Sequence, residues 1–320
     1  MKLLLAAAEG AAHFDILEDL SGEIPDLTIA RATTPEEIVR EIADTEVFYG
    51  FPTAAVVEAA PKLRWIQSPS AGVEYVAKVP ALVASDVILT NTRGAHGPSI
   101  GEHTFALLLA MTRRLPTSWG WQREHHWGRV EGYRTSREIM GSTMGIFGFG
   151  AIGRGIAQRA HAFEMPLLAV DAQAVDGQPW VDEVWPPSRL PDLLERSDVV
   201  VVATPLTAET RHLLDGPLLA RMKPDSYLIV VSRGGIVDEV ALAEALQAGR
   251  LAGAGLDVTE VEPLPADSPL WDAPNLIITP HLAGASWQKE RRCVEILKEN
   301  LLRFSKGEAL LNVVDKRRGY

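Results

Sequence analysis

A glycine-rich turn between a predicted strand and a predicted helix constrains the fold of this chain more than any other feature. The turn reads Gly148-Phe149-Gly150-Ala151-Ile152-Gly153; the apolar run 144–147 precedes it and a helical pattern over 152–163 follows it. At this spacing the first glycine permits a tight turn, the second lets the backbone approach a pyrophosphate, and the third lets helix and strand pack closely. A lone glycine pattern is weak, but this context predicts a dinucleotide at the helix N-terminus.

Short apolar runs that alternate with helical patterns extend this reading to the whole chain. Six candidate strands fall in the second part, at 144–147, 167–170, 199–202, 227–231, 253–256 and 276–278. Five more precede them, at 3–8, 27–30, 47–49, 65–67 and 87–89. Alternation of strand and helix predicts a parallel sheet, and six strands are what a dinucleotide-binding sheet uses.

Two helical patterns mark the expected domain boundaries. One covers about 99–113; the other covers about 286–304, is closed by Gly307, and is followed by a tail, 310–314, that we expect to pack on the first domain. The fold class is therefore α/β, with two Rossmann-like parallel-sheet domains and a cleft between them. We expect a flavodoxin-like substrate domain from residues 1–98 and 285–320, and a dinucleotide-binding domain from residues 99–284.

Composition limits the partners of such a chain. The 320 residues carry a formal net charge of -11, which disfavours a broad basic surface for nucleic acid or anionic lipid. The longest later apolar run, 105–111, is far short of the ~20 residues that a membrane span needs, and the N-terminus lacks a full signal-peptide core. The single cysteine, Cys293, indicates no oxidising compartment, so we expect an inert thiol and a cytoplasmic protein.

Metal ligands are not expected. His125 and His126 are adjacent in sequence and point to different faces of a helix, so they lack the spacing of a helical metal pair.

An acidic residue indicates which dinucleotide binds. Asp171 lies roughly 20 residues beyond the glycine turn, at the end of the apolar run 166–170. A carboxylate there accepts hydrogen bonds from a ribose diol and repels a 2′-phosphate. The sequence therefore predicts NAD, with NADP less favoured.

Several ordered motifs give the chain a resemblance to the D-isomer-specific 2-hydroxyacid dehydrogenases over nearly its whole length. Besides the glycine turn they are Ser70-Ala71-Gly72-Val73, Thr204-Pro205-Leu206, Ser232-Arg233-Gly234-Gly235, Leu256-Asp257, Glu262-Pro263-Leu264-Pro265, Thr279-Pro280-His281 and Asn312-Val313-Val314. The resemblance implies hydride transfer between NAD(H) and a small 2-keto or D-2-hydroxy acid; a glyoxylate or hydroxypyruvate reductase is one form of such an enzyme.

The resemblance also assigns roles to three catalytic residues. Arg233 would pair with the substrate carboxylate and polarise the keto oxygen, a task that suits a planar guanidinium. His281 would give its proton to the carbonyl oxygen during reduction and remove it during oxidation. Glu262 would hydrogen-bond the other ring nitrogen and set its tautomer. Glu260 is near enough in sequence to leave this last assignment open.

Weaker assignments follow by family analogy. Besides the glycine turn and Asp171, residues that would line the cofactor are Thr204, Pro205, Ser232 and Asp257. The amides of Ser70, Ala71, Gly72 and Val73 would bind the substrate carboxylate from the other domain, so the cleft would close and exclude water. The role of Phe51 stays open: it could contact the substrate or pack in the core.

Other interpretations stay open at this point. A nucleotide-sensing protein resembling the C-terminal-binding-protein corepressors would share this fold and these motifs. Formate dehydrogenases pair their histidine with glutamine, whereas this chain has Glu262. The tryptophans Trp119, Trp121 and Trp127 lie in a stretch that helps to build a dimer in the family, so we expect a homodimer, although core packing would also explain them. Departures from the family pattern are Gly101, Ala151 and Thr259.

Overall fold

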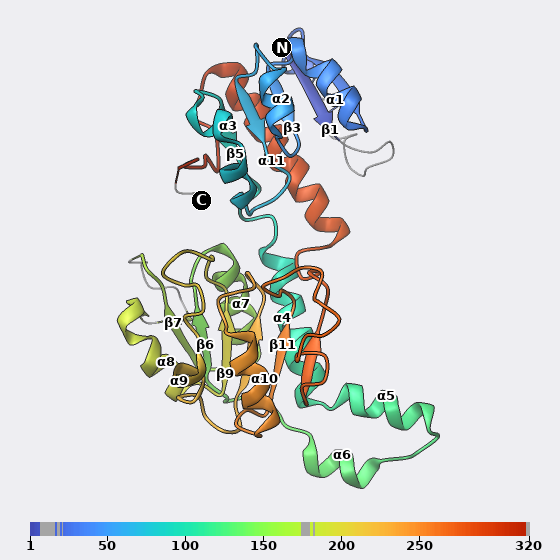
Figure 1. Ribbon diagram of the computed structural model, residues 1–320, viewed down its shortest axis with the longest axis vertical. Coiled ribbons are helices and arrows are strands. Elements are labelled where there is room, and N and C mark those ends of the chain that lie inside the picture. Colours follow the sequence, from blue (N-terminus) through green and yellow to red (C-terminus); the bar gives the residue numbers. More distant parts are fainter. Residues whose placement is uncertain (7–16, 18–19, 21, 174–179, 182, 318–320) are drawn as a thin grey trace. The chain divides into compact units, whose positions relative to one another are not determined.

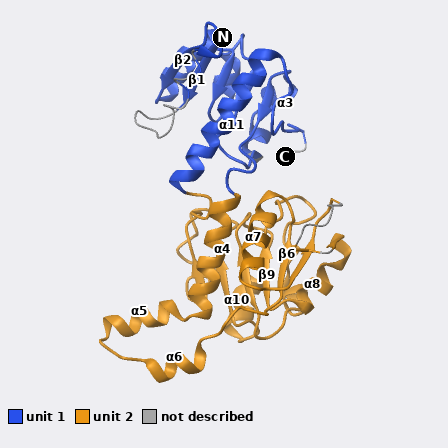
Figure 2. Ribbon diagram, turned by 180° about the vertical axis from the view of Figure 1, so that it is seen from behind, with its two compact units in different colours: residues 1–96, 286–320 blue, residues 97–285 orange. Residues whose placement is uncertain are grey.

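The chain forms two compact units, each with its own parallel sheet. The computed structural model describes residues 1–6, 17, 20, 22–173, 180–181 and 183–317. Unit 1 comprises residues 1–96 and 286–320, and unit 2 comprises residues 97–285 (Figure 2). The chain passes between the units after residues 96 and 285. The sequence-based boundaries, after residues 98 and 284, lie close to these positions.

Unit 1 contains a five-stranded sheet in the order β2-β1-β3-β4-β5 with every pair parallel. The strands are β1 (Lys2–Ala6), β2 (Thr28–Ala32), β3 (Val47–Tyr49), β4 (Trp65–Gln67) and β5 (Ile88–Thr90). This is the flavodoxin-like order, as the sequence predicted. Residues 7–8, where the first predicted strand ends, lie outside the described residues.

Helices cover both faces of this sheet, which is why its inner strands β1, β3 and β4 are almost entirely buried. On one face lie α1 (Pro35–Glu41), α2 (Ala54–Glu58) and α3 (Pro80–Ala84), together with the 3-10 turns Ile42–Asp44 and Glu74–Lys78. A capping box is present at α1, with Thr34 as its cap and Glu37 as its partner. On the other face, α11 (Trp287–Lys306) buries Val294, Leu297 and Leu301 against the sheet.

The C-terminal tail also belongs to unit 1. Helix α11 ends at Gly307, which has a left-handed φ of 70°. The chain then returns to β5, where Val314 N donates to Leu89 O at 2.9 Å and Val313 forms an antiparallel bridge with Thr90. The predicted packing of this tail on the first domain is confirmed.

Unit 2 contains a seven-stranded parallel sheet in the order β12-β11-β10-β9-β6-β7-β8. Its strands are β6 (Met144–Phe147), β7 (Leu167–Val170), β8 (Val184–Trp185), β9 (Val199–Val202), β10 (Tyr227–Val230), β11 (Gly253–Leu256) and β12 (Leu276–Ile278). Six were predicted; β8 has only two residues and too little pattern to be read. The strand order reverses between β6 and β9, and ligands of such sheets collect at the carboxyl ends near this point.

Both faces of the second sheet are buried. Val199 and Val201 face a cluster with α4 (Gly97–Thr112) and α7 (Ala151–Ala162). Val200 and Val202 face a cluster with α8 (Leu190–Arg196), α9 (Gly216–Leu219) and α10 (Glu239–Gln247); the 3-10 turn Pro187–Arg189 precedes α8. An uninterrupted run of valines is the expected sequence of a strand that packs on both sides.

Two helices, α5 (Leu115–Arg123) and α6 (Arg129–Thr135), extend from the body of unit 2 as an arm (Figure 1). Within the arm, Gly128, just before α6, packs against the indole of Trp121 on α5, because a Cβ at Gly128 would lie 2.6 Å from that ring. Trp119, Trp127 and Tyr133 are exposed, Trp127 at 87%. Burial in the core, the second explanation offered for these tryptophans, is therefore wrong for Trp119 and Trp127.

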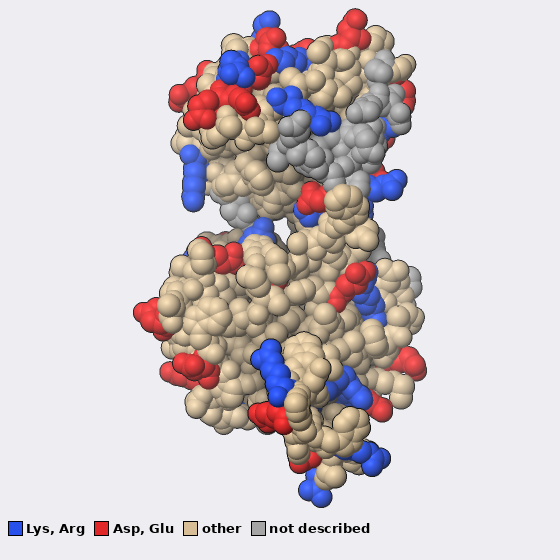
Figure 3. All heavy atoms as spheres, turned by 90° about the vertical axis from the view of Figure 1, so that its right-hand side faces the viewer, with Lys and Arg blue, Asp and Glu red and all other residues tan. Residues whose placement is uncertain are grey.

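On the face shown in Figure 3, basic and acidic side chains of the described residues are intermixed. Among the described helices, none is long and apolar enough to span a membrane.

Candidate active site

The glycine turn joins β6 to α7, and its three glycines differ in the space around them. Gly148 has a φ of 99°, and a Cβ there would lie 2.4 Å from Thr204 N at the end of β9. A Cβ at Gly153 would lie 2.1 Å from Gly148 O. At Gly150, by contrast, a Cβ would have nothing within 4 Å. The first and third glycines are thus demanded by protein packing, whereas the space beside Gly150 is open.

The N-terminus of α7 is suited to an anion. Its N-cap is Gly150, which has no side chain that could accept hydrogen bonds from the amides of the first turn. Backbone amides and the helix dipole at such an end favour a phosphate group.

Asp171 follows β7 and lies against the glycine turn. Its Oδ2 accepts a hydrogen bond from Phe149 N at 2.6 Å, and its Oδ1 accepts one from Gln173 N at 2.9 Å. Each carboxylate oxygen has two lone pairs, so both retain room for a ribose hydroxyl.

Ser232 supplies a second indication of a ligand. Its hydroxyl, two residues beyond β10, is buried and has no hydrogen-bond partner among the described residues. Buried hydroxyls normally have a partner, so a ligand with polar groups would complete this one. With the open space at Gly150, it makes the carboxyl edge of this sheet fit a dinucleotide.

Arg233 follows Ser232, and its Nη1 donates to Ser232 O at 2.7 Å. The glycine that follows Arg233 is required by protein packing. A Cβ at Gly234 would lie 2.0 Å from the backbone of Thr259, so the glycine allows two protein segments to meet. Close approach to a ligand is therefore not the reason for this glycine.

His281 and Glu262, two of the predicted catalytic residues, are in contact. His281 Nδ1 lies 2.8 Å from Glu262 Oε2, and the two side chains are 49% and 39% exposed. Thr259 N donates to Glu262 Oε1 at 3.2 Å, which leaves Oε2 to the imidazole. An ionised carboxylate only accepts hydrogen bonds, so it holds the proton on Nδ1 and leaves Nε2 for a reacting group.

Glu260 has other partners. Its Oε1 lies 2.7 Å from Arg211 Nη1 and its Oε2 lies 2.8 Å from His212 Nε2. Both partners belong to the loop that follows β9. The geometry therefore gives the contact with His281 to Glu262 and ties Glu260 to a neighbouring loop.

Asp257, expected along the cofactor, is bound to the segment that carries His281. Its carboxylate accepts hydrogen bonds from Thr279 Oγ1 at 2.6 Å and from Leu282 N and Ala283 N, each at 2.8 Å. The Thr279 hydroxyl has a second partner, His103, whose Nε2 lies 2.9 Å from Thr279 Oγ1. Sequence reasoning missed His103, because only a long-range contact distinguishes it from other polar residues of α4.

The predicted carboxylate-binding loop follows β4 in unit 1. Ser70 N donates to Ser68 Oγ at 3.2 Å, and Ala71 O accepts from Asn91 Nδ2 at 2.8 Å. Gly72 is partly buried and Val73 is buried. These residues lie in unit 1, whereas Arg233, Glu262 and His281 all lie in unit 2.

The structure also places Phe51, which the sequence left open, and Cys293, which the sequence predicted to be inert. Phe51 is 55% exposed and touches Tyr75 edge-on, so core packing does not explain it. Cys293 is buried, and burial is the largest cause that raises the pKa of its thiol, as expected of an inert cysteine.

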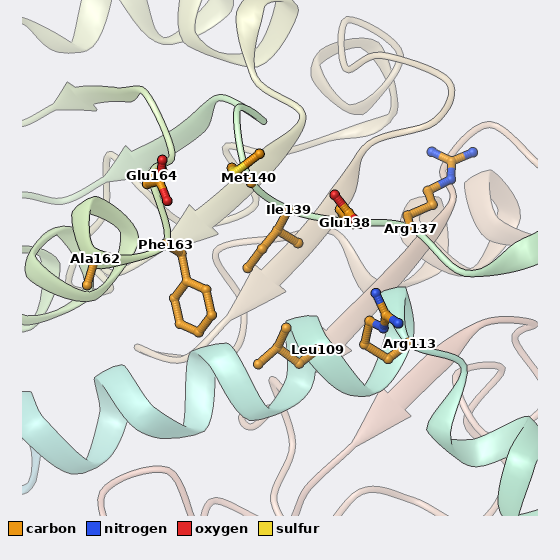
Figure 4. Close-up of a pocket in the computed structure, with 9 residues that line it drawn as sticks. All are labelled: Leu109, Arg113, Arg137, Glu138, Ile139, Met140, Ala162, Phe163 and Glu164. Carbon is orange, nitrogen blue, oxygen red and sulfur yellow. The ribbon is translucent and has the colours of Figure 1, made fainter. Parts of the chain in front are cut away.

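A pocket of about 280 Å³ lies at the amino ends of the strands of the second sheet, and Figure 4 shows the residues that line it. Its lining includes Leu109 near the end of α4, Ile139 before β6 and Phe163 after α7. None of the candidate site residues lines it. The described residues hold no group of three or more His, Cys, Asp or Glu placed for a metal ion.

A doubly wound sheet with a glycine turn, an acid after its second strand and a glutamate–histidine pair at the same edge defines a nucleotide-dependent oxidoreductase. The family model described as D-isomer specific 2-hydroxyacid dehydrogenase, NAD binding domain, matches residues 105–283. The chain belongs to this family and is an NAD-dependent D-2-hydroxyacid dehydrogenase by class, as the sequence predicted.

Individual relatives agree with this assignment. A glyoxylate reductase from Thermofilum pendens is 35% identical over 88% of this chain and 84% of its own length. The structure of a D-isomer specific 2-hydroxyacid dehydrogenase family protein from Aeromonas salmonicida matches with a TM-score of 0.84 and 34% identity, over 98% of this chain and 99% of that one. An NADPH-dependent glyoxylate/hydroxypyruvate reductase from Sinorhizobium meliloti, solved with NADP, matches with a TM-score of 0.82 and 25% identity, over 100% and 99%.

Proposed function

We propose that this protein reduces a small 2-keto acid, of the size of glyoxylate or hydroxypyruvate, to the D-2-hydroxy acid with His281 as the acid–base group. The observation that carries the proposal is the hydrogen bond of 2.8 Å between His281 Nδ1 and Glu262 Oε2, at the sheet edge that also holds the glycine turn. The names of two relatives support a substrate of this size.

The proposed residues have complementary tasks. A dinucleotide held at the glycine turn and Asp171 would supply the hydride that the keto carbon needs. His281 gives the proton on Nε2 to the carbonyl oxygen, and Glu262 keeps the ring oriented and stabilises its charged form. Arg233 holds the substrate carboxylate with a forked pair of hydrogen bonds. One hydride and one proton convert the keto group into the hydroxyl, so the charges balance.

Cofactor choice follows from Asp171. Its carboxylate beside the glycine turn disfavours a 2′-phosphate, so we propose a preference for NADH over NADPH. Thr204, Pro205 and Ser232 complete the proposed cofactor contacts. Carboxylate binding by the amides of Ser70 to Val73 stays a prediction, as does the cytoplasmic location.

We also propose a homodimer formed through the arm. The exposed aromatics of α5 and α6 support it, as does a cavity of about 760 Å³ between the two helices, lined by Trp121, Trp127 and Tyr133. Aromatic side chains are enriched in the buried centres of protein interfaces.

Turnover tests the proposed activity. Purified protein should oxidise NADH, followed at 340 nm, with glyoxylate, hydroxypyruvate or a larger 2-keto acid, and more efficiently than it oxidises NADPH. His281→Ala should lower kcat by about 10²-fold or more, since general acid catalysis contributes that much, without weakening NADH binding measured by fluorescence. His161→Ala, which changes an exposed histidine on α7, is the matched control and should keep full activity.

A different result would favour the sensing alternative. Tight NADH binding without turnover across the keto-acid panel would overturn the enzymatic proposal and favour a nucleotide-sensing protein.

A further inference from the structure

A histidine outside the proposed reacting set lies against the segment that carries His281. His103 is on α4, its side chain is 20% exposed, and its Nε2 lies 2.9 Å from Thr279 Oγ1 and 3.4 Å from Asp257 Oδ1. Thr279 and Asp257 each directly follow a strand, β12 and β11, and these strands are neighbours in the sheet. The three side chains therefore form one chain of contacts from α4 to the sheet edge.

The direction of these hydrogen bonds follows from counting protons. Asp257 accepts backbone N–H groups on both carboxylate oxygens, so it acts as an acceptor. The single hydroxyl proton of Thr279 is donated to Asp257 Oδ1 at 2.6 Å. Thr279 Oγ1 must then accept from His103, so His103 Nε2 carries a proton.

Asp257 in turn holds the backbone at His281. Its carbonyl oxygen accepts from His281 N at 2.8 Å, and its two carboxylate oxygens accept from Leu282 N and Ala283 N. One residue thus binds three consecutive amides. His281 itself has a φ of 54°, in the left-handed region that a residue with a side chain rarely adopts, so its conformation depends on such contacts.

Helix α4 meets this segment at a second point. Ser99 Oγ donates to Gly284 O at 3.4 Å, one helical turn before His103. Residues four apart lie on the same face of a helix, so Ser99 and His103 form one side of α4 that contacts residues 279–284.

We propose that His103 is a positioning residue: through Thr279 and Asp257 it holds the backbone at 281–283 and so determines where the His281 imidazole lies. Its effect on turnover rests on the function proposed above, whereas its effect on the backbone does not. The Nε2–H of His103 orients the Thr279 hydroxyl toward Asp257, and that orientation keeps the Asp257 carboxylate aligned with the amides of Leu282 and Ala283. Small displacements of a proton donor reduce catalysis strongly, so a residue with no substrate contact can affect the rate.

Two substitutions at residue 103 separate the hydrogen bond from packing. His103→Leu keeps a side chain of similar size but removes the donor. We expect hydrogen exchange of the Leu282 and Ala283 amides to become at least about tenfold faster, with kcat about tenfold lower and the Kd for NADH within twofold. His103→Gln places an N–H donor near the position of Nε2 and should restore both amide protection and kcat to within about threefold. A purely structural role in α4 packing predicts no such rescue.

A double-mutant cycle tests the path through Thr279. Thr279→Val removes the hydroxyl at nearly constant shape and should have the same effects as His103→Leu, and the double variant should be no worse than either alone. Thr112→Val is the control: it removes a buried threonine hydroxyl on α4, the helix that carries His103, and this hydroxyl donates to Leu108 O. It should leave turnover and the exchange of Leu282 and Ala283 unchanged.

Unchanged exchange at Leu282 and Ala283 in His103→Leu would overturn the proposal, as would additive effects of the two substitutions. The exchange measurement needs no substrate. Absence of keto-acid turnover in the wild-type protein would therefore contradict the proposed function alone, and the exchange rates would still decide whether His103 positions the backbone.

Discussion

At the scale of single residues, the two glutamates of the loop after β11 differ in what their side chains contact. Glu262 contacts His281, whereas Glu260 contacts Arg211 and His212. We expect Glu262→Gln to lower kcat by about tenfold or more, because an amide loses the charge beside the imidazole and can present an N–H to Nδ1. Glu260→Gln should retain most of kcat. Comparable losses of kcat in steady-state assays of both variants would contradict this division.

A third carboxylate, Glu239, predicts a dependence of stability on pH. It is partly buried, and burial is the largest cause that raises its pKa above 4.5, although the hydrogen bond from Glu260 N opposes the shift. A raised pKa means that ionisation costs more in the folded than in the unfolded state, so stability falls as pH rises from 4.5 through the folded pKa. Glu239→Gln keeps an acceptor for Glu260 N and should raise the Tm at pH 7.5 but not at pH 4. A lower Tm than wild type at pH 7.5 would contradict this.

At the scale of elements, the β6–α7 turn contains two glycines whose replacement by alanine should affect different properties: NADH affinity at Gly150 and stability at Gly148. Gly150→Ala places its Cβ in open space, so the Tm should stay within about 2 °C of wild type, while the Kd for NADH should rise by about tenfold or more because the methyl group faces the proposed pyrophosphate position. Gly148→Ala should unfold at a lower temperature, since its Cβ would meet the backbone of Thr204. Thermal melts and NADH fluorescence titrations measure both. Unaltered NADH affinity in Gly150→Ala would show that this space is not used by the cofactor.

At the scale of the whole molecule, the arm of α5 and α6 predicts the oligomeric state. Trp127 and Tyr133 are 87% and 88% exposed, and placing two carboxylates there should disrupt an interface built on them. Light scattering should find a dimer for the wild type and a monomer for the Trp127→Glu, Tyr133→Glu variant. Val240→Glu, an exposed apolar position on α10, is the control and should remain dimeric. A monomeric wild type at micromolar concentration would contradict the homodimer.

Much of the fold could be read from local pattern. Apolar runs placed six strands of the second sheet, and the spacing of three glycines between a strand and a helix indicated a dinucleotide. These predictions succeed because each depends on neighbours within about 10 residues, where periodicity and turn chemistry act. The two-residue strand β8 was missed because its pairing with β7, rather than its own sequence, makes it a strand.

The sequence by itself determined the parallel architecture, the glycine turn and, through ordered motifs, the residues proposed for hydride transfer. Only the tertiary structure decided which glutamate meets His281, why Gly234 must be a glycine, and that His103 reaches Thr279 across 176 positions of the chain. Such contacts depend on how the loops at the ends of neighbouring strands are brought together. No local pattern encodes the contact between His103 and Thr279, because it is produced by the packing of the whole sheet and its helices.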